Sequence, residues 1–287
     1  MRNFISEDDI EQAILQKLEG DPFQYGILRC DPSPDKRELL PDGTGRSSKK
    51  ECVLPLILRE ALARLNPDIP GEKLEEIARD LCRDFSATDM TATNYKYYNQ
   101  IRNGIKISLR RNGKEDFDFV KLVDFDRPEN NTFTAVSQMW IQGRVYWRRP
   151  DVLIFINGLP MVFVELKNSI VKVEEAYNDN LKNYLRDIPN LFAFNQICVL
   201  SNGLETRLGA FNATYNHFFE WLKVNSEKER PDRQALKEAG TVGESSVRYF
   251  IDGLLRKDRL VDYIENFIMF RNQKNKIIAK NHQYFGV

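Results

Sequence analysis

The N-terminal third of the chain carries hydrophobic residues at helical spacing. In "SEDDIEQAILQKLE", Ile10, Ile14, Leu15 and Leu18 fall on one stripe, and Ser6 precedes them in the position of an N-cap. The same spacing predicts further helices at roughly 51–65, 71–85 and 91–103. We therefore expect the chain to open with a helical region.

The middle of the chain changes to a period of two, which is typical of strands. "FDFVKLVDF" (117–125) and "FTAVSQMWI" (133–141) read as strands joined by the turn-rich "DRPENN", and a hairpin of two apolar strands follows at 147–168. After the hairpin we expect an amphipathic helix over 173–188, strands at 196–202 and 206–211, and a closing apolar segment at 218–224. The order of helix, three strands, helix and strand predicts an α/β fold.

The C-terminal part begins with a polar and charged stretch. Residues 224–246 read as a linker, and amphipathic helices are expected at roughly 245–256 and 258–270. We therefore place a domain boundary near residue 225.

Composition excludes several classes of function. The 42 Lys and Arg residues balance the 42 Asp and Glu residues, so a nucleic-acid surface would have to be a local patch. The four cysteines form no CxxC pair and there are two histidines, so neither a zinc site nor a histidine-based triad is expected. No apolar run approaches the roughly 20 residues of a membrane span, and the acidic N-terminus lacks a signal-peptide core. We expect a cytoplasmic protein whose chemistry uses carboxylates and lysine.

Residues 31–50 are rich in proline, glycine and charge. The stretch "GTGRSSKK" within them lacks the GxxxxGK[ST] order of a phosphate-binding loop, so a plain loop is predicted. Because a phosphate cradle and its lysine are missing, the chain should hydrolyse no ATP, which an assay of the pure protein with and without DNA can check. DNA-stimulated ATPase activity would contradict this prediction and the boundary near residue 225.

Basic residues gather in two local groups that could follow a DNA backbone. The first group is Arg102, Lys106, Arg110, Arg111 and Lys114, and the second is Arg144, Arg148 and Arg149. A solvated surface explains the first group equally well. Arg148 and Arg149 adjoin the hairpin acids described next, so a phosphate contact is favoured there. Such a contact would position DNA without reading its sequence.

Three charged residues stand in the most hydrophobic hairpin of the chain. Asp151 opens its first strand, and Glu165 and Lys167 share one face of the second, because residues two apart point the same way. Two carboxylates paired across strands, about 4.5–5.5 Å apart at Cβ, would repel unless a cation lay between them. Mg²⁺ prefers such oxygen ligands, and a neighbouring lysine suits phosphodiester hydrolysis. The alternative is a solvated strand face, although the apolar flanks favour burial, where unpaired charge is costly.

The turn of this hairpin sets a condition on the site. "NG" at 157–158 predicts a two-residue turn, for which the numbers of opposed residues sum to 315. Asp151 would then oppose Val164 and point away from Glu165, because a slip of one residue moves every side chain to the other face. We therefore predict a correction, either a three-residue loop that makes the sum 314 or 316, or a β-bulge near Asp151.

The same residues carry a resemblance to a known family. "RPD", thirteen residues and then "ELK" match the PD-(D/E)xK nuclease signature. The longer strings "RRPDVLIFINGLPMVFVELKN", "DIPNLF" and "VLSNGLETRLG" resemble the N-terminal nuclease domain of the restriction (R) subunit of type I restriction–modification enzymes. The resemblance covers at least residues 117–287. It implies a restriction-endonuclease-like α/β core, with a mixed sheet flanked by helices and a helical N-terminal elaboration, as an endonuclease domain over 1–225.

The resemblance also implies the chemistry of the site. Asp151 and Glu165 would bind Mg²⁺, with the backbone carbonyl of Leu166 as a further ligand. Lys167 would position the attacking water or stabilise charge at phosphorus. The substrate would be double-stranded DNA.

Three more residues match elements of the family near the scissile phosphate. The Q-x-x-x-Y element reads Asn180-x-x-x-Tyr184 here, which departs from the family by placing the amide on a shorter arm. Tyr184 also lies on the apolar face of its helix and would fit a core position. Glu11 matches an acid that the superfamily often places beside the metal, and a solvent-exposed position is the equal alternative for it.

Finally, the resemblance implies partners. In the family, an ATP-driven motor of helicase type follows the nuclease domain, and methyltransferase and specificity subunits complete the complex. "KNHQYFGV" resembles the segment before the motor, where Gln283 would contact adenine, so 226–287 would lead into a motor that this fragment lacks. The alternatives are a stand-alone nuclease or resolvase with the same core, and a catalytically silent docking module. A docking module should show no metal-dependent change in stability.

Overall fold

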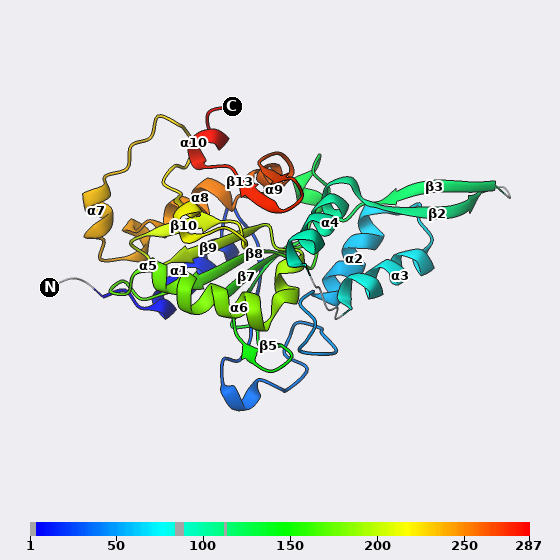
Figure 1. Ribbon diagram of the computed structural model, residues 1–287, viewed down its shortest axis with the longest axis horizontal. Coiled ribbons are helices and arrows are strands. Elements are labelled where there is room, and N and C mark those ends of the chain that lie inside the picture. Colours follow the sequence, from blue (N-terminus) through cyan, green and yellow to red (C-terminus); the bar gives the residue numbers. More distant parts are fainter. Residues whose placement is uncertain (1–3, 84–88, 112–113) are drawn as a thin grey trace.

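A computed structural model describes residues 4–83, 89–111 and 114–287. Its centre is a seven-stranded mixed sheet with helices on both faces (Figure 1). The order of the strands across the sheet is β1-β4-β7-β8-β9-β10-β11. This architecture confirms the α/β fold and the mixed, helix-flanked sheet expected from the sequence.

The sheet is built around β8, which is antiparallel to β7 and parallel to β9. Every residue of β7 and β8 is buried, as is usual for central strands covered on both faces. The strands of the main sheet are β1 (Gly26–Arg29), β4 (Phe133–Ser137), β7 (Val152–Ile156), β8 (Leu159–Leu166), β9 (Ile197–Ser201), β10 (Thr206–Gly209) and β11 (Phe219–Glu220). Elsewhere in the described part of the chain, two-stranded ribbons pair β2 (Ile105–Arg111) with β3 (Lys114–Val120), β5 (Ile141–Gln142) with β6 (Trp147–Arg148), and β12 (Ile268–Arg271) with β13 (Asn275–Ile278).

The helices are α1 (Glu7–Glu19), α2 (Pro55–Leu65), α3 (Gly71–Cys82), α4 (Met90–Asn103), α5 (Val173–Glu175), α6 (Lys182–Asp187), α7 (Arg233–Lys237), α8 (Val247–Leu254), α9 (Lys257–Asn266) and α10 (Asn281–Tyr284). Most helices lie close to the ranges that the hydrophobic spacing predicts, but α7 lies within the stretch expected as a linker and α10 was not predicted. Between α5 and α6 the chain forms one π-helical segment, η3 (Ala176–Leu181). The predicted helix over 173–188 is therefore present, with a local change of pitch inside it.

The first helix begins where the sequence predicts. The side chain of Ser6 accepts the N–H of Asp9 at 3.1 Å, and the Asp9 carboxylate accepts the N–H of Ser6 at 2.9 Å. This reciprocal pair satisfies two backbone donors that the helix itself cannot. The apolar stripe of α1 is buried in the hydrophobic core on one face of the sheet.

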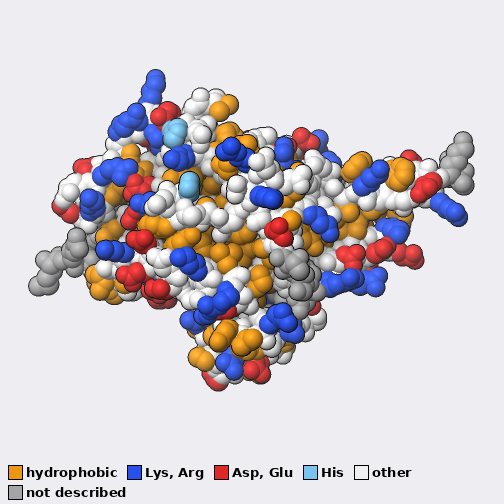
Figure 2. Space-filling model, viewed as in Figure 1, with side chains coloured by type: hydrophobic (Ala, Val, Ile, Leu, Met, Phe, Trp, Pro, Cys, Tyr) orange, Lys and Arg blue, Asp and Glu red, His pale blue; other side chains and the backbone are white. Residues whose placement is uncertain are grey.

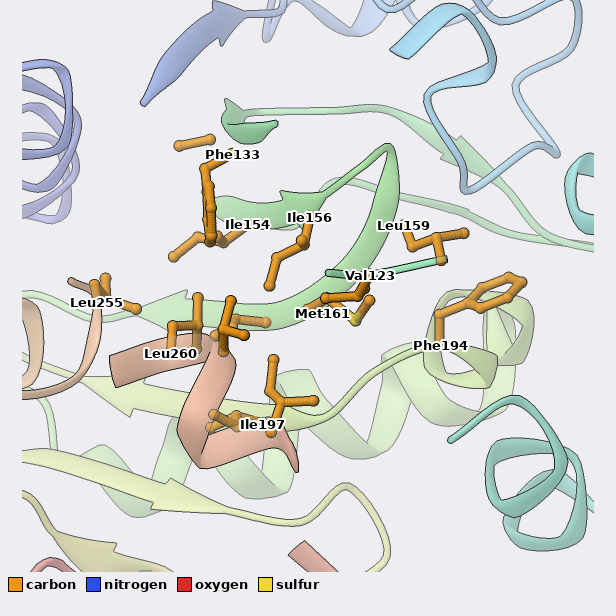
Figure 3. Close-up of a cluster of buried hydrophobic side chains, with 14 of the residues drawn as sticks. Val123, Phe133, Ile154, Ile156, Leu159, Met161, Phe194, Ile197, Leu255 and Leu260 are labelled. Atoms are coloured by element: carbon orange, nitrogen blue, oxygen red, sulfur yellow. The ribbon is translucent and has the colours of Figure 1, made fainter. Parts of the chain in front are cut away.

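Each face of the sheet has its own hydrophobic core, because side chains alternate along the central strands. On one face, Val152, Ile154 and Val164 pack with α1, α8 and α9, and Figure 3 shows part of this cluster. On the other face, Leu153 and Phe163 pack against η3 and α6. Residues of α8 and α9 belong to the first core, so the sequence position near 225 is not a break in the hydrophobic core. None of the described helices is long and apolar enough to cross a membrane.

The loop over residues 31–50 is ordered by buried charge. The ammonium group of Lys49 and the guanidinium group of Arg46 both lie 2.7 Å from one carboxylate oxygen of Asp42. Arg46 also donates to the carbonyls of Glu51 and Trp140. Since these basic groups of "GTGRSSKK" are neutralised internally, the segment is a structural loop.

Strand pairing around β3 differs from the sequence prediction. The segment 117–125 was expected as a strand beside 133–141, but β3 ends at Val120 and pairs with β2 as an antiparallel ribbon. β4 instead pairs with β1 and β7 in the main sheet. Figure 1 shows the β2–β3 ribbon extending beyond α2 and α3.

The turn of the central hairpin offers a test of close packing. Gly158 has a φ of +81°, and a Cβ added there would lie 2.6 Å from the carbonyl oxygen of Leu54 and 2.8 Å from the backbone nitrogen of Leu58. Gly43 has a similar φ of +82° but open space around it. We expect Gly158→Ala to destabilise the protein by about 3 kcal/mol or more, and Gly43→Ala by about 1 kcal/mol. Urea unfolding measures both, and equal losses would mean that only backbone strain matters at Gly158.

Candidate active site

The β7–β8 hairpin contains both a two-residue turn and a register shift. Asn157 and Gly158 have φ angles of +52° and +81°, and the flanking pair Ile156–Leu159 sums to 315. The next pair, Phe155–Pro160, keeps this register. The register then shifts, and Ile154 pairs with Val162, so that Met161 is the extra residue of a β-bulge.

This bulge decides which face carries the charged residues. From Ile154 outward, opposed residues sum to 316, and Val152 pairs with Val164. One further step along the same register places Asp151 opposite Glu165. Met161 and Ile154 enter one hydrophobic cluster (Figure 3). The predicted correction is confirmed as a bulge, while the three-residue loop is wrong, and the bulge lies at Met161 instead of beside Asp151.

Asp151 is held by a backbone group of β8 and by one of the residue that follows β4. Its Oδ2 accepts the N–H of Leu166 at 2.7 Å, and its own carbonyl accepts the N–H of Gln138 at 3.0 Å. Burial raises the pKa of Asp151 to about 6, although the hydrogen bond from Leu166 and the charge of Lys167 both oppose the rise. These two hydrogen bonds therefore fix the position of Asp151 at the end of the hairpin, just before β7 begins.

Glu165 and Lys167 lie beside Asp151. The side chain of Glu165 is 2% exposed, and its Oε1 lies 3.3 Å from the ammonium nitrogen of Lys167. The same ammonium donates to the carbonyl of Leu166 at 2.9 Å. Burial, and then the nearby charge of Asp151, raise the pKa of Glu165 well above its usual value. One lysine thus faces two acids whose charged forms are both disfavoured.

The donor set of this site fits a divalent cation. Among the residues that the structure describes, the Oε2 atom of Glu165 is buried with no hydrogen-bond partner. Two carboxylates and one backbone carbonyl are hard oxygen donors of the kind that Mg²⁺ binds. No three His, Cys, Asp or Glu side chains of the described residues are grouped so that they alone could hold a metal, and the carbonyl of Leu166 therefore matters. That carbonyl also accepts from the ammonium group of Lys167, so the lysine lies beside the position that a cation would take.

Glu11 reaches this site through another side chain. It is buried, at 6% exposure, so the solvent-exposed alternative for it is wrong. Its Oε2 accepts a hydrogen bond from the Nε2 atom of Gln138, which also lies 3.5 Å from the Oδ1 atom of Asp151. Burial raises the pKa of Glu11. Sequence reasoning missed Gln138, because a glutamine within an apparent strand carries no signal of this contact.

Asn180 and Tyr184 occupy different environments. Tyr184 is buried, its ring packs edge-on against Phe163 with centroids 5.2 Å apart, and its hydroxyl donates to the carbonyl of Arg149 at 2.9 Å. The nearby acid Glu165 helps burial to raise the pKa of Tyr184 well above its usual value. Asn180 is half-buried in η3, and its side chain makes no hydrogen bond to any described residue. The structure therefore brings Tyr184 to the site and leaves Asn180 without a visible role there.

The arginines next to the site are engaged in internal contacts. Arg148 pairs with the buried carboxylate of Asp187, and the Nε–Oδ2 distance is 2.8 Å. Arg149 donates to the carbonyl of Pro32 at 2.7 Å and lies over the ring of Trp140. A phosphate contact by Arg148 would have to compete with Asp187. DNA binding by either arginine stays a prediction.

The first basic group lies on and beside the β2–β3 ribbon. Lys106 and Arg110 are exposed, and the ammonium nitrogen of Lys106 lies 4.1 Å from the centroid of the Phe117 ring. The side chains of Arg111 and Lys114 lie outside the described residues. Figure 2 shows Lys and Arg side chains interspersed with Asp and Glu over the face that it presents. The described side chains on that face therefore form no continuous basic surface.

Gln283 lies far along the chain, on α10. Its Oε1 accepts the N–H of Lys280 at 2.8 Å, so it caps its own helix. The side chain is exposed and lines a cavity together with Arg271 and Lys280. Its predicted contact with adenine in a longer protein stays a prediction.

Known proteins resemble this chain along most of its length. A family model described as the N terminus of the type I restriction enzyme R protein matches residues 4–217. The chain is 32% identical over 291 residues to the type I restriction enzyme HindI endonuclease subunit of Haemophilus influenzae, covering 99% of this chain and 26% of that protein. It is 30% identical over 298 residues to a protein of Methanocaldococcus jannaschii named putative type I restriction enzyme MjaIXP endonuclease subunit, covering 97% and 27%. The chain thus spans about a quarter of the length of these relatives.

Proposed function

Because this chain belongs to the family of type I restriction enzyme R protein N termini, we propose that it is the Mg²⁺-dependent DNA endonuclease domain of such an R subunit. The observation that carries the proposal is the bulge at Met161, which pairs Val152 with Val164, so that the same register continued by one residue sets Asp151 opposite Glu165. In a regular hairpin the two acids would lie on opposite faces. The bulge therefore assembles the charged site within an otherwise apolar hairpin.

Asp151, Glu165 and the carbonyl of Leu166 would hold the cation. When bound, Mg²⁺ neutralises the two acids and supplies Lewis-acid stabilisation of charge on a phosphate oxygen. The Leu166 N–H fixes one oxygen of Asp151, and the other lies 3.5 Å from the Nε2 atom of Gln138. The Oε2 atom of Glu165 is buried and has no hydrogen-bond partner among the described residues, so it would be available as a ligand once the acid is ionised.

Lys167 supplies the positive charge of the site. Its ammonium group lies beside the Leu166 carbonyl and would face the phosphate and the attacking water. Hydrolysis forms a bond between the water oxygen and phosphorus, breaks one phosphorus–oxygen ester bond, and transfers a proton to the departing oxygen. The lysine would orient the water and stabilise the negative charge that builds on the phosphate in this step.

The activity of this domain would depend on other parts of a longer protein and on other subunits. We propose that cleavage follows ATP-driven translocation by a motor outside this chain, and that methyltransferase and specificity subunits select the DNA. The family and the relatives support a role within such a complex, because the relatives are named as endonuclease subunits of type I restriction enzymes.

The test is a nicking assay on supercoiled plasmid with Mg²⁺ or Mn²⁺, with the Asp151→Ala variant beside the wild type. A metal titration of the melting temperature runs in parallel, because binding to the folded state raises its stability. The proposal expects metal-dependent nicking and a metal-dependent rise in melting temperature, both lost in the variant. If neither metal changes the stability or the DNA, the proposal fails and the docking-module alternative is favoured.

A further inference from the structure

Gln138 adopts a backbone conformation that a glutamine rarely takes. It directly follows β4, with a φ of +56° in the left-handed region. A non-glycine residue there costs on the order of 1 kcal/mol, and glycine would avoid this cost. The N–H of Gln138 extends the pairing of β4 with β7 by donating to the carbonyl of Asp151. Backbone geometry alone would thus favour glycine here, so the side chain needs a separate explanation.

The side-chain amide of Gln138 lies between two acids from different elements. Its Nε2 donates to Glu11 of α1 and lies 3.5 Å from the Oδ1 atom of Asp151. The other oxygen of Asp151 is held by the N–H of Leu166. Asp151 therefore has a donor at each oxygen, one from β8 and one from the residue after β4.

The acids fix the orientation of this amide. A reversed amide would place its oxygen against the carboxylate oxygens, which accept hydrogen bonds when ionised and would repel it. In the orientation observed, the Oε1 atom of Gln138 is buried and has no hydrogen-bond partner among the described residues. The amide thus leaves one buried acceptor unsatisfied in order to donate to the acids, and such an acceptor has a cost.

We propose that Gln138 is a positioning residue of the metal site, which holds the Asp151 carboxylate in place and ties it to Glu11 on the N-terminal helix. The inference rests on the proposed function for the presence of a cation. Gln138 touches no reacting atom in this role. It sets the direction of a ligand, and loss of such outer partners typically weakens metal binding about 10- to 100-fold.

Two substitutions separate the amide from the backbone. Gln138→Gly relieves the left-handed strain and removes the amide, whereas Gln138→Met keeps a side chain of similar length without hydrogen bonding. Gln12→Met is the matched control, because Gln12 lies on the exposed side of α1, next to Glu11 in sequence. For each purified protein, the rise in melting temperature is measured across a Mn²⁺ titration, together with the Mn²⁺ concentration that gives half-maximal nicking.

We expect Gln138→Gly to be at least as stable as the wild type without metal, yet to need about tenfold more Mn²⁺ in both measurements. Gln138→Met should need a similar increase, and Gln12→Met should behave as the wild type. If both Gln138 variants keep the wild-type metal response, Gln138 is only a turn residue and the inference is overturned.

Asp151→Ala, measured in the same series, separates this inference from the proposed function. If Asp151→Ala loses the metal response while the Gln138 variants keep it, only the role of Gln138 is refuted. If Asp151→Ala also keeps the wild-type response, the metal site itself is wrongly assigned, and the proposed function fails with it.

Discussion

Alanine substitution of Asp151, Glu165 or Lys167 is expected to lower DNA cleavage by at least about 10²-fold without unfolding the protein. The reason is that the bulge at Met161 sets the two acids opposite each other, and the lysine lies 3.3 Å from one of them. Each variant removes a different part of a single site. Nicking of supercoiled plasmid at saturating Mg²⁺ measures the loss, and circular dichroism checks the fold.

The control for these variants is Lys172→Ala, because Lys172 is exposed and close in sequence to the site. It should cleave at the wild-type rate. If any of the three site variants also cleaved at that rate, the role assigned to its residue would be wrong.

The metal-free protein is expected to become more stable when Asp151 is replaced by asparagine. The pKa of Asp151 rises from 3.8 to about 6 on folding, because burial disfavours its charged form. A rise of this size in the pKa corresponds to a loss of folding stability of about 3 kcal/mol at neutral pH. This cost is fully present above pH 6 and disappears below about pH 4, since the raised pKa makes the folded state bind more protons than the unfolded state. Asparagine keeps an oxygen that can accept from Leu166 and removes the charge.

Urea unfolding of the wild type and of Asp151→Asn in EDTA at pH 4, 6 and 8 tests this pH dependence. The difference between variant and wild type should grow toward pH 8 and approach zero at pH 4. Added Mg²⁺ should stabilise the wild type and leave the variant unchanged, because the metal neutralises the charge that burial penalises. A variant that is less stable than the metal-free wild type at pH 8 would show that the Asp151 charge is compensated within the protein.

Local sequence was sufficient wherever neighbouring residues decide the structure. The capping pair of Ser6 and Asp9 and the apolar stripe behind it fixed the start and inner face of α1. The apolar runs flanking "NG" gave the central hairpin and its two-residue turn, because that turn depends on two adjacent residues with positive φ. The acids of the hairpin could be selected as a site because charge in so apolar a segment needs a partner.

Pairing between distant segments was less predictable. The segment that begins at Phe117 has the period of a strand, but the same pattern fits any partner. β3 pairs with β2 and not with β4, whose neighbours are β1 and β7. The choice depends on which backbone edges remain free after the sheet packs, and periodicity carries no information about that.

By itself, the sequence predicted most of the helices and the apolar hairpin, and it singled out Asp151, Glu165 and Lys167 as the candidate site. It also showed that a regular two-residue hairpin could not bring the acids together, but not where the correction would lie. Only the tertiary structure decided that Met161 is the extra residue and that Gln138 joins Asp151 to Glu11, an acid 127 positions away from Gln138 in the chain. Packing on both faces of the sheet decides where a bulge lies, and a contact between α1 and the end of β4 forms only after both elements have docked. Neither feature can therefore be predicted from neighbouring residues in the sequence.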